Sequence, residues 1–167
     1  LLSTPLIHSS RTAQPLFYEE FVVYASAKEQ LLSEKYVLAK AIDINRLCLL
    51  EEVHCLHSQV FNLCELKNKE RHVHQLDFAT GSIETLKRIV ETNQGITILP
   101  FLALADMTSK QKDNIRRFKS PAPAREIGLV TYRYFVKEQL IKGLKEEILK
   151  NIPPEMTSSL RKKLVGM

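Results

Sequence analysis

Apolar, strand-like runs alternate with amphipathic helical segments along this chain of 167 residues. The run 17–25 and the shorter runs 46–51 and 96–99 are rich in branched aliphatic and aromatic residues, which is typical of buried strands. Segment 82–93 instead repeats its apolar residues at helical spacing, so it predicts an amphipathic helix. Helices between strands predict an α/β fold with a largely parallel sheet.

The same reasoning extends the order of elements to the end of the chain. Ser82 is expected to cap the helix 82–93, and Gly95 is expected to end it. The other expected elements are strands over 72–79, 115–119 and 127–133, a short helix over 100–104, a long helix from 136 to 148, and a last helix over 155–164.

Composition predicts a domain with a core of its own and no membrane segment. Hydrophobic residues make up 44% of the chain, enough for one domain or two small lobes. No apolar run reaches the length of a membrane span, and no basic-then-apolar leader is expected. The net charge of +5 is spread along the sequence, which predicts a solvated face rather than a nucleic-acid groove. Three cysteines, an odd number, argue against a disulfide framework and favour a cytoplasmic protein.

Two of these cysteines, Cys55 and Cys64, stand nine residues apart in a segment that is predicted to be a helix from about residue 55 to residue 66. At about 100° per residue, nine steps place the two thiols on opposite faces of that helix. The same steps rise about 13.5 Å along the axis, whereas a disulfide needs its α-carbons within roughly 4.4–6.8 Å. The two thiols therefore cannot form a disulfide while the helix is intact, but they can form one once the helix unwinds. That is the geometry of a redox switch, and the alternative is two ordinary buried cysteines.

The helical pattern also predicts different surroundings for the two sulfur atoms. Cys64 falls within an apolar stripe formed by Leu56, Val60, Phe61 and Leu63. Cys55 points the other way, over Ser58, Gln59 and Asn62, at the start of the helix. Unpaired N–H groups and the dipole at a helix N-terminus favour a thiolate, and His54 and His57 add further donors. Cys55 is therefore the expected nucleophile.

Several motifs resemble one known family at matching separations. Segment 49–56, followed by Cys64, resembles the redox segment of OxyR-type hydrogen-peroxide sensors, which are LysR-type transcription regulators. Segments 79–86, 95–100 and 123–130 resemble the same family, and the likeness runs from about residue 1 to about residue 148. The pattern over 95–100 is common to LysR-type effector domains and supports only the fold. The His-Cys pair with a second cysteine nine residues on is specific to the peroxide sensors.

The resemblance implies a two-lobed, periplasmic-binding-protein-like effector domain with mainly parallel sheets and a ligand cleft between the lobes. It assigns residues 1–17 and 127–167, with a C-terminal helix, to the remaining part of a first lobe. Residues 18–126 form the second lobe and carry the redox segment. Most of the first lobe, and the winged helix-turn-helix that reads DNA, are expected upstream of Leu1.

The resemblance also implies roles for individual residues. Cys55 matches the peroxide-reactive cysteine and Cys64 the resolving one, with no cofactor or metal involved. His54 matches the histidine beside the reactive sulfur, and Arg125 matches an arginine whose charge favours the thiolate. His57, with Ser58 after it, occupies the place of an Arg-Asp pair found in many relatives, so the support from a permanent charge is missing there.

The function predicted is that of a peroxide-sensing regulatory domain of a transcription activator, not an enzyme. Hydrogen peroxide is the expected ligand, and self-association as a homodimer or tetramer is expected. DNA and RNA polymerase are expected to bind only through the full-length protein. The alternatives are a LysR-type effector domain for a small organic ligand with structural cysteines, a thiol peroxidase, and a periplasmic-type solute-binding lobe.

Two smaller candidates complete the sequence reading. His72 and His74 share one face of an expected strand, where they are either metal ligands or an exposed strand face. Cys48 lies in the apolar run 46–51 and is expected in the core.

Overall fold

The computed structural model describes residues 1–4, 11–51, 55–64, 80–132 and 137–166. Its strands are β1 (Leu2–Thr4), β2 (Arg11–Ala25), β3 (Tyr36–Val37), β4 (Ile96–Pro100), β5 (Ile115–Phe118), β6 (Ala122–Tyr132) and β7 (Lys162–Leu164). Its α-helices are α1 (Cys55–Leu63), α2 (Ile83–Asn93), α3 (Ser109–Asp113) and α4 (Glu138–Lys150). Short 3₁₀ turns are η1 (Gln30–Ser33), η2 (Ala39–Ala41), η3 (Ile44–Arg46), η6 (Phe101–Leu104) and η7 (Pro154–Met156). None of the helices among these residues is long and apolar enough to cross a membrane.

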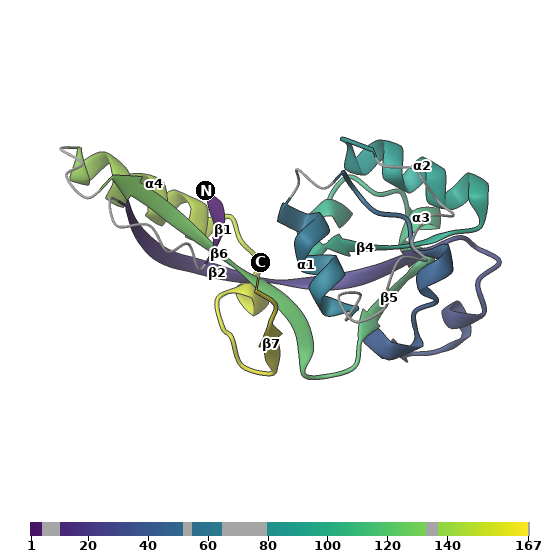
Figure 1. The fold of residues 1–167 in the computed structure, drawn as a ribbon. Helices are drawn as coiled ribbons and strands as arrows, with labels where there is room; N and C mark the ends of the chain where they lie inside the picture. The colour runs from purple at the N-terminus through teal and green to yellow at the C-terminus, as the bar shows by residue number, and fades with distance from the viewer. Residues whose placement is uncertain (5–10, 52–54, 65–79, 133–136, 167) are drawn as a thin grey trace.

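Two long strands, β2 and β6, join the two halves of the molecule (Figure 1). They pair antiparallel through nine residue pairs, with an irregularity between Pro15 and Phe17. Strand β1 lies on the far edge of β6 in one half, together with α4. In the other half β2 continues without β6 and enters a second sheet.

In this second sheet β2 is the central strand, and its neighbours run against it. Strands β4 and β5 both pair antiparallel with β2, while β3 runs parallel to β5. Leu47 and Leu50 add single parallel bridges to Ile96 and Thr80, so the expected strand over 46–51 is reduced to two contacts. The α/β architecture is confirmed, but parallel pairing does not dominate. Four of the six strand pairings in the described ranges are antiparallel, because the connecting strand β2 enters the middle of the sheet in the opposite direction.

Buried hydrophobic residues form two separate cores. The larger core gathers β2 beyond Glu20, strand β4, α2 and the buried side of α1. The smaller core lies in the other half and consists of Leu16, Phe17, Ile127, Leu129 and Met156. Ile141 and Ile148 of α4 pack on the smaller core, whereas Leu140 and Leu144 on the same helix are exposed. The predicted lobe boundaries stay a prediction.

The end of helix α2 differs from the glycine stop that the sequence predicts. Gln94, not Gly95, adopts the left-handed conformation, with φ 53° and ψ 39°. A Cβ atom on Gly95 would lie 2.7 Å from the Sγ atom of the buried Cys48, so the glycine is needed for space rather than for its φ angle. At the other end, Ser82 occupies the N-cap position without the expected side-chain hydrogen bond.

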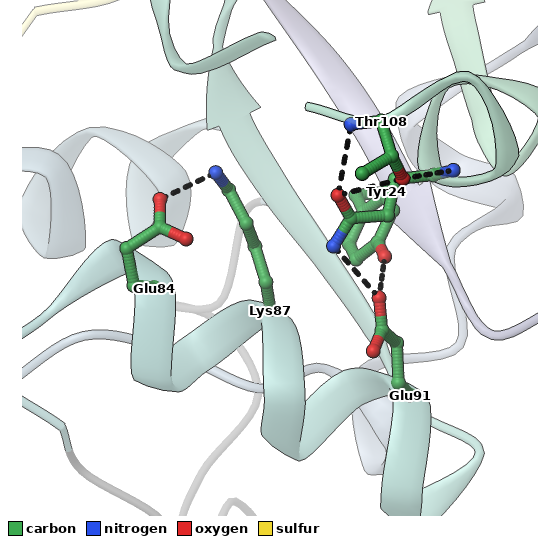
Figure 2. A network of polar contacts seen from close by, with 6 residues as sticks. Tyr24, Glu84, Lys87, Glu91 and Thr108 are labelled. Atoms are coloured by element: carbon green, nitrogen blue, oxygen red, sulfur yellow. Dashed lines mark hydrogen bonds and ion pairs between the residues drawn. The ribbon is translucent and has the colours of Figure 1, made fainter. Parts of the chain in front are cut away.

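A polar network fastens α2 and α3 to β2 (Figure 2). Tyr24 of β2 is fully buried, and its hydroxyl bonds to the carboxylate of Glu91 on α2. The same carboxylate accepts a 3.1 Å bond from Gln111, which forms a capping box with Thr108 at the start of α3. Burial, together with Glu91, raises the pKa of Tyr24 far above its ordinary value, so the phenol keeps its proton. The network is structural, because its tyrosine is inaccessible and neutral.

The C-terminal segment is not the helix predicted over 155–164. It forms the short turn η7 and then strand β7, which pairs parallel with β6 at Ala122–Ala124. The Nζ atom of Lys162 donates to the carbonyl oxygens of Tyr18 and Ser158 at 3.2 and 2.8 Å. These bonds, and a β6 edge with free backbone groups, favour an extended tail over a helix. The strand expected over 72–79 lies outside the described residues.

Candidate redox site

Helix α1 carries the two cysteines of the predicted switch, one at each end. It begins at Cys55, as the sequence predicts, and the N–H of Cys64 still donates to the oxygen of Val60 at 3.0 Å. Nine helical steps separate the two α-carbons by about 13.5 Å along the axis, far more than the roughly 4.4–6.8 Å that a disulfide spans. Cys64 is a free thiol. The side chain of Cys55 and the helix expected over 65–66 lie outside the described residues.

The apolar stripe predicted on α1 is confirmed. Leu56 and Val60 are only 5% and 2% exposed and belong to the larger core. Phe61, Leu63 and Cys64 are partly buried and pack against the same core. The thiol of Cys64 therefore has hydrocarbon around it, and α1 is held in place by the side that carries this thiol.

Gln59 fastens the other side of α1 to the first strand. Its side chain is fully buried, and its Nε2 atom donates to the hydroxyl of Ser3 on β1 at 2.6 Å. The hydroxyl of Ser3 in turn donates to the backbone oxygen of Glu126 on β6 at 3.5 Å. The Oε1 atom of Gln59 has no hydrogen-bond partner among the described residues. The helical pattern predicts Gln59 on a polar face near Cys55, and this prediction does not include its burial. The partner, Ser3, lies 56 residues away, so the local sequence carries no signal of it.

The thiol of Cys64 is kept protonated by its surroundings. Burial raises its pKa to about 11, because a thiolate loses hydration when hydrocarbon replaces water. Cys48 is fully buried in the larger core, as expected, and burial raises the pKa of its thiol too. Both sulfurs pack in or against the larger core, and the loss of hydration there disfavours the thiolate form that a nucleophilic cysteine needs. The thiol of Cys64 can therefore form a disulfide with a sulfur that is already oxidised, but it should react slowly with an oxidant itself.

Arg125 forms an ion pair with a buried carboxylate. Its Nε and Nη2 atoms both lie 2.8 Å from the Oε2 atom of Glu19, whose side chain is 1% exposed. The second oxygen of Glu19 accepts a 2.8 Å bond from the N–H of Leu102. The pair joins β6 to β2 next to the point where Ser3 meets Glu126. The carboxylate of Glu19 is therefore a buried and aligned partner for Arg125.

The histidines of the predicted site are only partly placed. His57 is half-buried on α1, and its ring stacks on Phe61 with a centroid distance of 5.9 Å and an interplanar angle of 19°. His54, His72 and His74 lie outside the described residues. In the described part of the chain no group of three or more His, Cys, Asp or Glu side chains is arranged to hold a metal ion.

A contact without any signal in the sequence ties α1 to the C-terminal tail. The Nδ2 atom of Asn62 donates to the backbone oxygen of Gly166 at 3.0 Å. Val165, the residue before it, bonds through its N–H to Ala124 of β6 at 2.8 Å and packs against the larger core. Helix α1 is thus attached to the core, to β1 and to the end of the described chain.

The fold and the cysteine helix define a class of protein. Residues 1–150 match the LysR substrate binding domain, and the chain belongs to that family. The predicted fold class, a periplasmic-binding-protein-like effector domain, is thereby confirmed.

Several of the similar proteins within the family are named as regulators of the response to hydrogen peroxide. A probable hydrogen peroxide-inducible genes activator from Mycobacterium avium is 29% identical over 130 residues, covering 78% of this chain and 41% of the relative. The DNA-binding transcriptional dual regulator OxyR of Escherichia coli is 30% identical over 118 residues, covering 70% of this chain and 37% of the relative. The crystal structure of OxyR from Porphyromonas gingivalis has a TM-score of 0.84 and 28% identity, covering 99% of this chain and 74% of that one. The chain thus spans about two fifths of the curated relatives.

Proposed function

We propose that this chain is a peroxide-sensing regulatory domain of a LysR-type transcription regulator that switches through a reversible Cys55–Cys64 disulfide. The observation that carries the proposal is the arrangement of α1. One cysteine stands at the first residue of the helix, and the other, a free and protonated thiol, stands just past its last residue. The names of the relatives support the same function.

The chemistry proceeds in two balanced steps. The thiolate of Cys55 attacks one oxygen of hydrogen peroxide, and the O–O bond breaks. The products are a sulfenic acid on Cys55 and, after protonation of the leaving hydroxide, one water molecule. The thiol of Cys64 then attacks the sulfenic sulfur and releases a second water molecule as the disulfide forms. An external thiol reductant restores both thiols.

The second step requires α1 to unwind, because the two sulfur atoms cannot meet across an intact helix. Unwinding removes Leu56 and Val60 from the core, at a cost of about 1.5–3 kcal/mol for each fully buried side chain. It also breaks the bonds of Gln59 to Ser3 and of Asn62 to Gly166. Because these bonds attach α1 to β1 and to the tail, a change in α1 reaches both halves of the molecule.

The supporting residues and partners belong to the same proposal. His54 and His57 supply donors near the reactive sulfur, and Arg125 orders the adjacent strands through Glu19. We assign residues 1–17 with 127–167 to one lobe and residues 18–126 to the other, and the presence of two separate cores supports a division into two lobes. The protein self-associates in the cytoplasm, and DNA and RNA polymerase bind through the full-length regulator.

The test is mass spectrometry of every thiol before and after one equivalent of hydrogen peroxide. We expect loss of the Cys55 and Cys64 thiols together, with a mass decrease that corresponds to one disulfide. Cys55→Ser should abolish rapid reaction, whereas Cys64→Ser should leave a sulfenic acid on Cys55 that a dimedone probe traps. Cys48→Ala is the matched control, because Cys48 is fully buried and is not part of α1, and it should react like the unaltered chain.

Three results would redirect the proposal. Equal loss of the initial rate in Cys55→Ser and Cys64→Ser would contradict the division of roles between the two thiols. Sustained consumption of peroxide with an added dithiol reductant, at enzyme-like turnover, would favour a thiol peroxidase instead. Thiols that stay intact under stoichiometric peroxide would favour an effector domain for a small organic ligand.

A further inference from the structure

A cavity of about 560 Å³ opens where the end of α1 meets β3, β5 and the C-terminal tail. Its apolar wall includes Val37, Ile42, Leu63, Phe118 and Pro123, and the side chain of Cys64 forms part of the same wall. Clefts of about 300–1,000 Å³ with mainly apolar walls are typical of small-molecule sites. The peroxide chemistry proposed above has no need of such a volume, since hydrogen peroxide is little larger than water.

The position of the cavity in the fold is one that binding sites favour. Strands β3 and β5 run parallel, and their last residues, Val37 and Phe118, both line the cavity. It continues along the residues that follow each strand, Leu38 and Lys119. In open α/β sheets, ligands bind in the crevice outside the carboxyl ends of parallel strands. The cavity therefore lies at the ends of two parallel strands, where backbone and loop groups can contact a ligand.

The described residues that line the cavity carry charges of one sign. Lys40, Lys119 and Lys163 are among them, and none of these described lining residues is acidic. In the described ranges none of these three lysines takes part in an ion pair. The three come from distant parts of the chain, the third from β7 in the C-terminal tail. Three unpaired ammonium groups above an apolar interior are complementary to a molecule with a carboxylate at one end and hydrocarbon at the other.

We propose that this cavity binds a small amphipathic carboxylate, with its hydrocarbon part against Val37, Ile42 and Phe118 and its carboxylate among the three lysines. The site does not depend on the peroxide chemistry, because only Leu63 and Cys64 of its lining belong to the segment that is proposed to unwind. A bound molecule covers the wall formed by Leu63 and Cys64. Occupancy therefore shields the thiol of Cys64 from reagents.

Decanoate is the probe, with decyltrimethylammonium as the matched cation and acetate as the matched anion without a chain. By calorimetry the chain should bind decanoate saturably, at one site per chain, and should bind neither control. Lys119→Glu and Lys163→Glu should each weaken decanoate binding by about tenfold. Lys112→Glu should leave it unchanged, since Lys112 is an exposed residue of α3 outside the cavity lining.

A second readout locates the ligand. In a Cys55→Ser chain, saturating decanoate should slow alkylation of Cys64 by iodoacetamide at least fivefold, as measured by peptide mass spectrometry. Absence of saturable binding would overturn the proposal, as would equal binding of decanoate and decyltrimethylammonium. Equal weakening by Lys112→Glu would show attraction to the overall positive charge rather than a site. Saturable binding without protection of Cys64 would place the ligand elsewhere and also contradict the proposal.

Discussion

Cys64 is a protected thiol, and its protonation state can be measured. With a pKa of about 11, only roughly one Cys64 thiol in ten thousand is ionised at pH 7. In a Cys55→Ser chain, the rate of Cys64 alkylation by iodoacetamide should therefore rise about tenfold per pH unit and level off only near pH 11. In the urea-unfolded chain the rate should level off near the ordinary cysteine pKa. A plateau near pH 8 in the folded chain would contradict the burial argument.

The same raised pKa has a consequence for stability. The unfolded chain loses the Cys64 proton at lower pH than the folded chain does. The contribution of this thiol to stability is therefore complete below the ordinary pKa and is lost as the pH rises towards about 11.

Arg125 is best tested through the carboxylate that it neutralises. Arg125→Met leaves the buried Glu19 with only the Leu102 N–H as a partner, so it should destabilise the chain by about 3–5 kcal/mol. Lys150→Met is the matched control, because Lys150 and Glu147 are both exposed and such a pair is worth about 0–1 kcal/mol. Urea denaturation measures both. Glu19→Gln added to Arg125→Met should restore part of the loss, and equal costs for Arg125→Met and Lys150→Met would show that the Glu19 pair is not a buried charge pair.

Among the elements, the end of α2 lies in close contact with the segment carrying Cys48, because Gly95 leaves no room for a Cβ atom there. Gly95→Ala places a Cβ atom against the Cys48 sulfur, and such overpacking costs about 1–3 kcal/mol. Gly143→Ala is the control, since nothing lies within 4 Å of its Cβ position in α4, and it should stabilise by about 0.5–1 kcal/mol. Thermal unfolding should separate the two variants in opposite directions. Adding Cys48→Ala should relieve Gly95→Ala, and a persistent loss in the double variant would contradict the steric explanation.

Elements with strong local patterns could be predicted from the sequence, and those set by distant contacts could not. Helices α1 and α2 follow from their apolar spacing, and the start of α1 at Cys55 agrees with a helix predicted from about that residue. Burial of Gln59, by contrast, depends on Ser3, and the extended form of β7 depends on the edge of β6. The directions of the strands escaped prediction for the same reason, since the path of β2 through both halves leaves no local signature.

At the scale of the whole molecule, we expect that this chain by itself does not bind DNA with sequence specificity. Its charge of +5 is spread along the sequence and supports at most weak, salt-sensitive contact. In gel-shift experiments at physiological salt, we expect no preference for a peroxide-responsive promoter over random DNA. A clear preference that persists at that salt concentration would contradict the assignment of DNA reading to another part of the regulator.

The attachments of α1 decide how far a change at the cysteines travels. The helix is held by the larger core, by Ser3 of β1 and by Gly166 of the tail, so it touches both halves of the molecule. If the switch works by unwinding α1, all three attachments are lost together, and both halves should respond to the redox state.

Hydrogen exchange of the backbone amides in α1 tests this account most directly. The reduced chain and the peroxide-oxidised chain are compared by mass spectrometry, with the Cys55–Cys64 disulfide confirmed in the oxidised sample. We expect the amides of residues 56–64 to exchange at least a hundredfold faster after oxidation, while those of α2 keep their protection. Equal protection of α1 in the two forms, with the disulfide present, would show that this helix is not the switch.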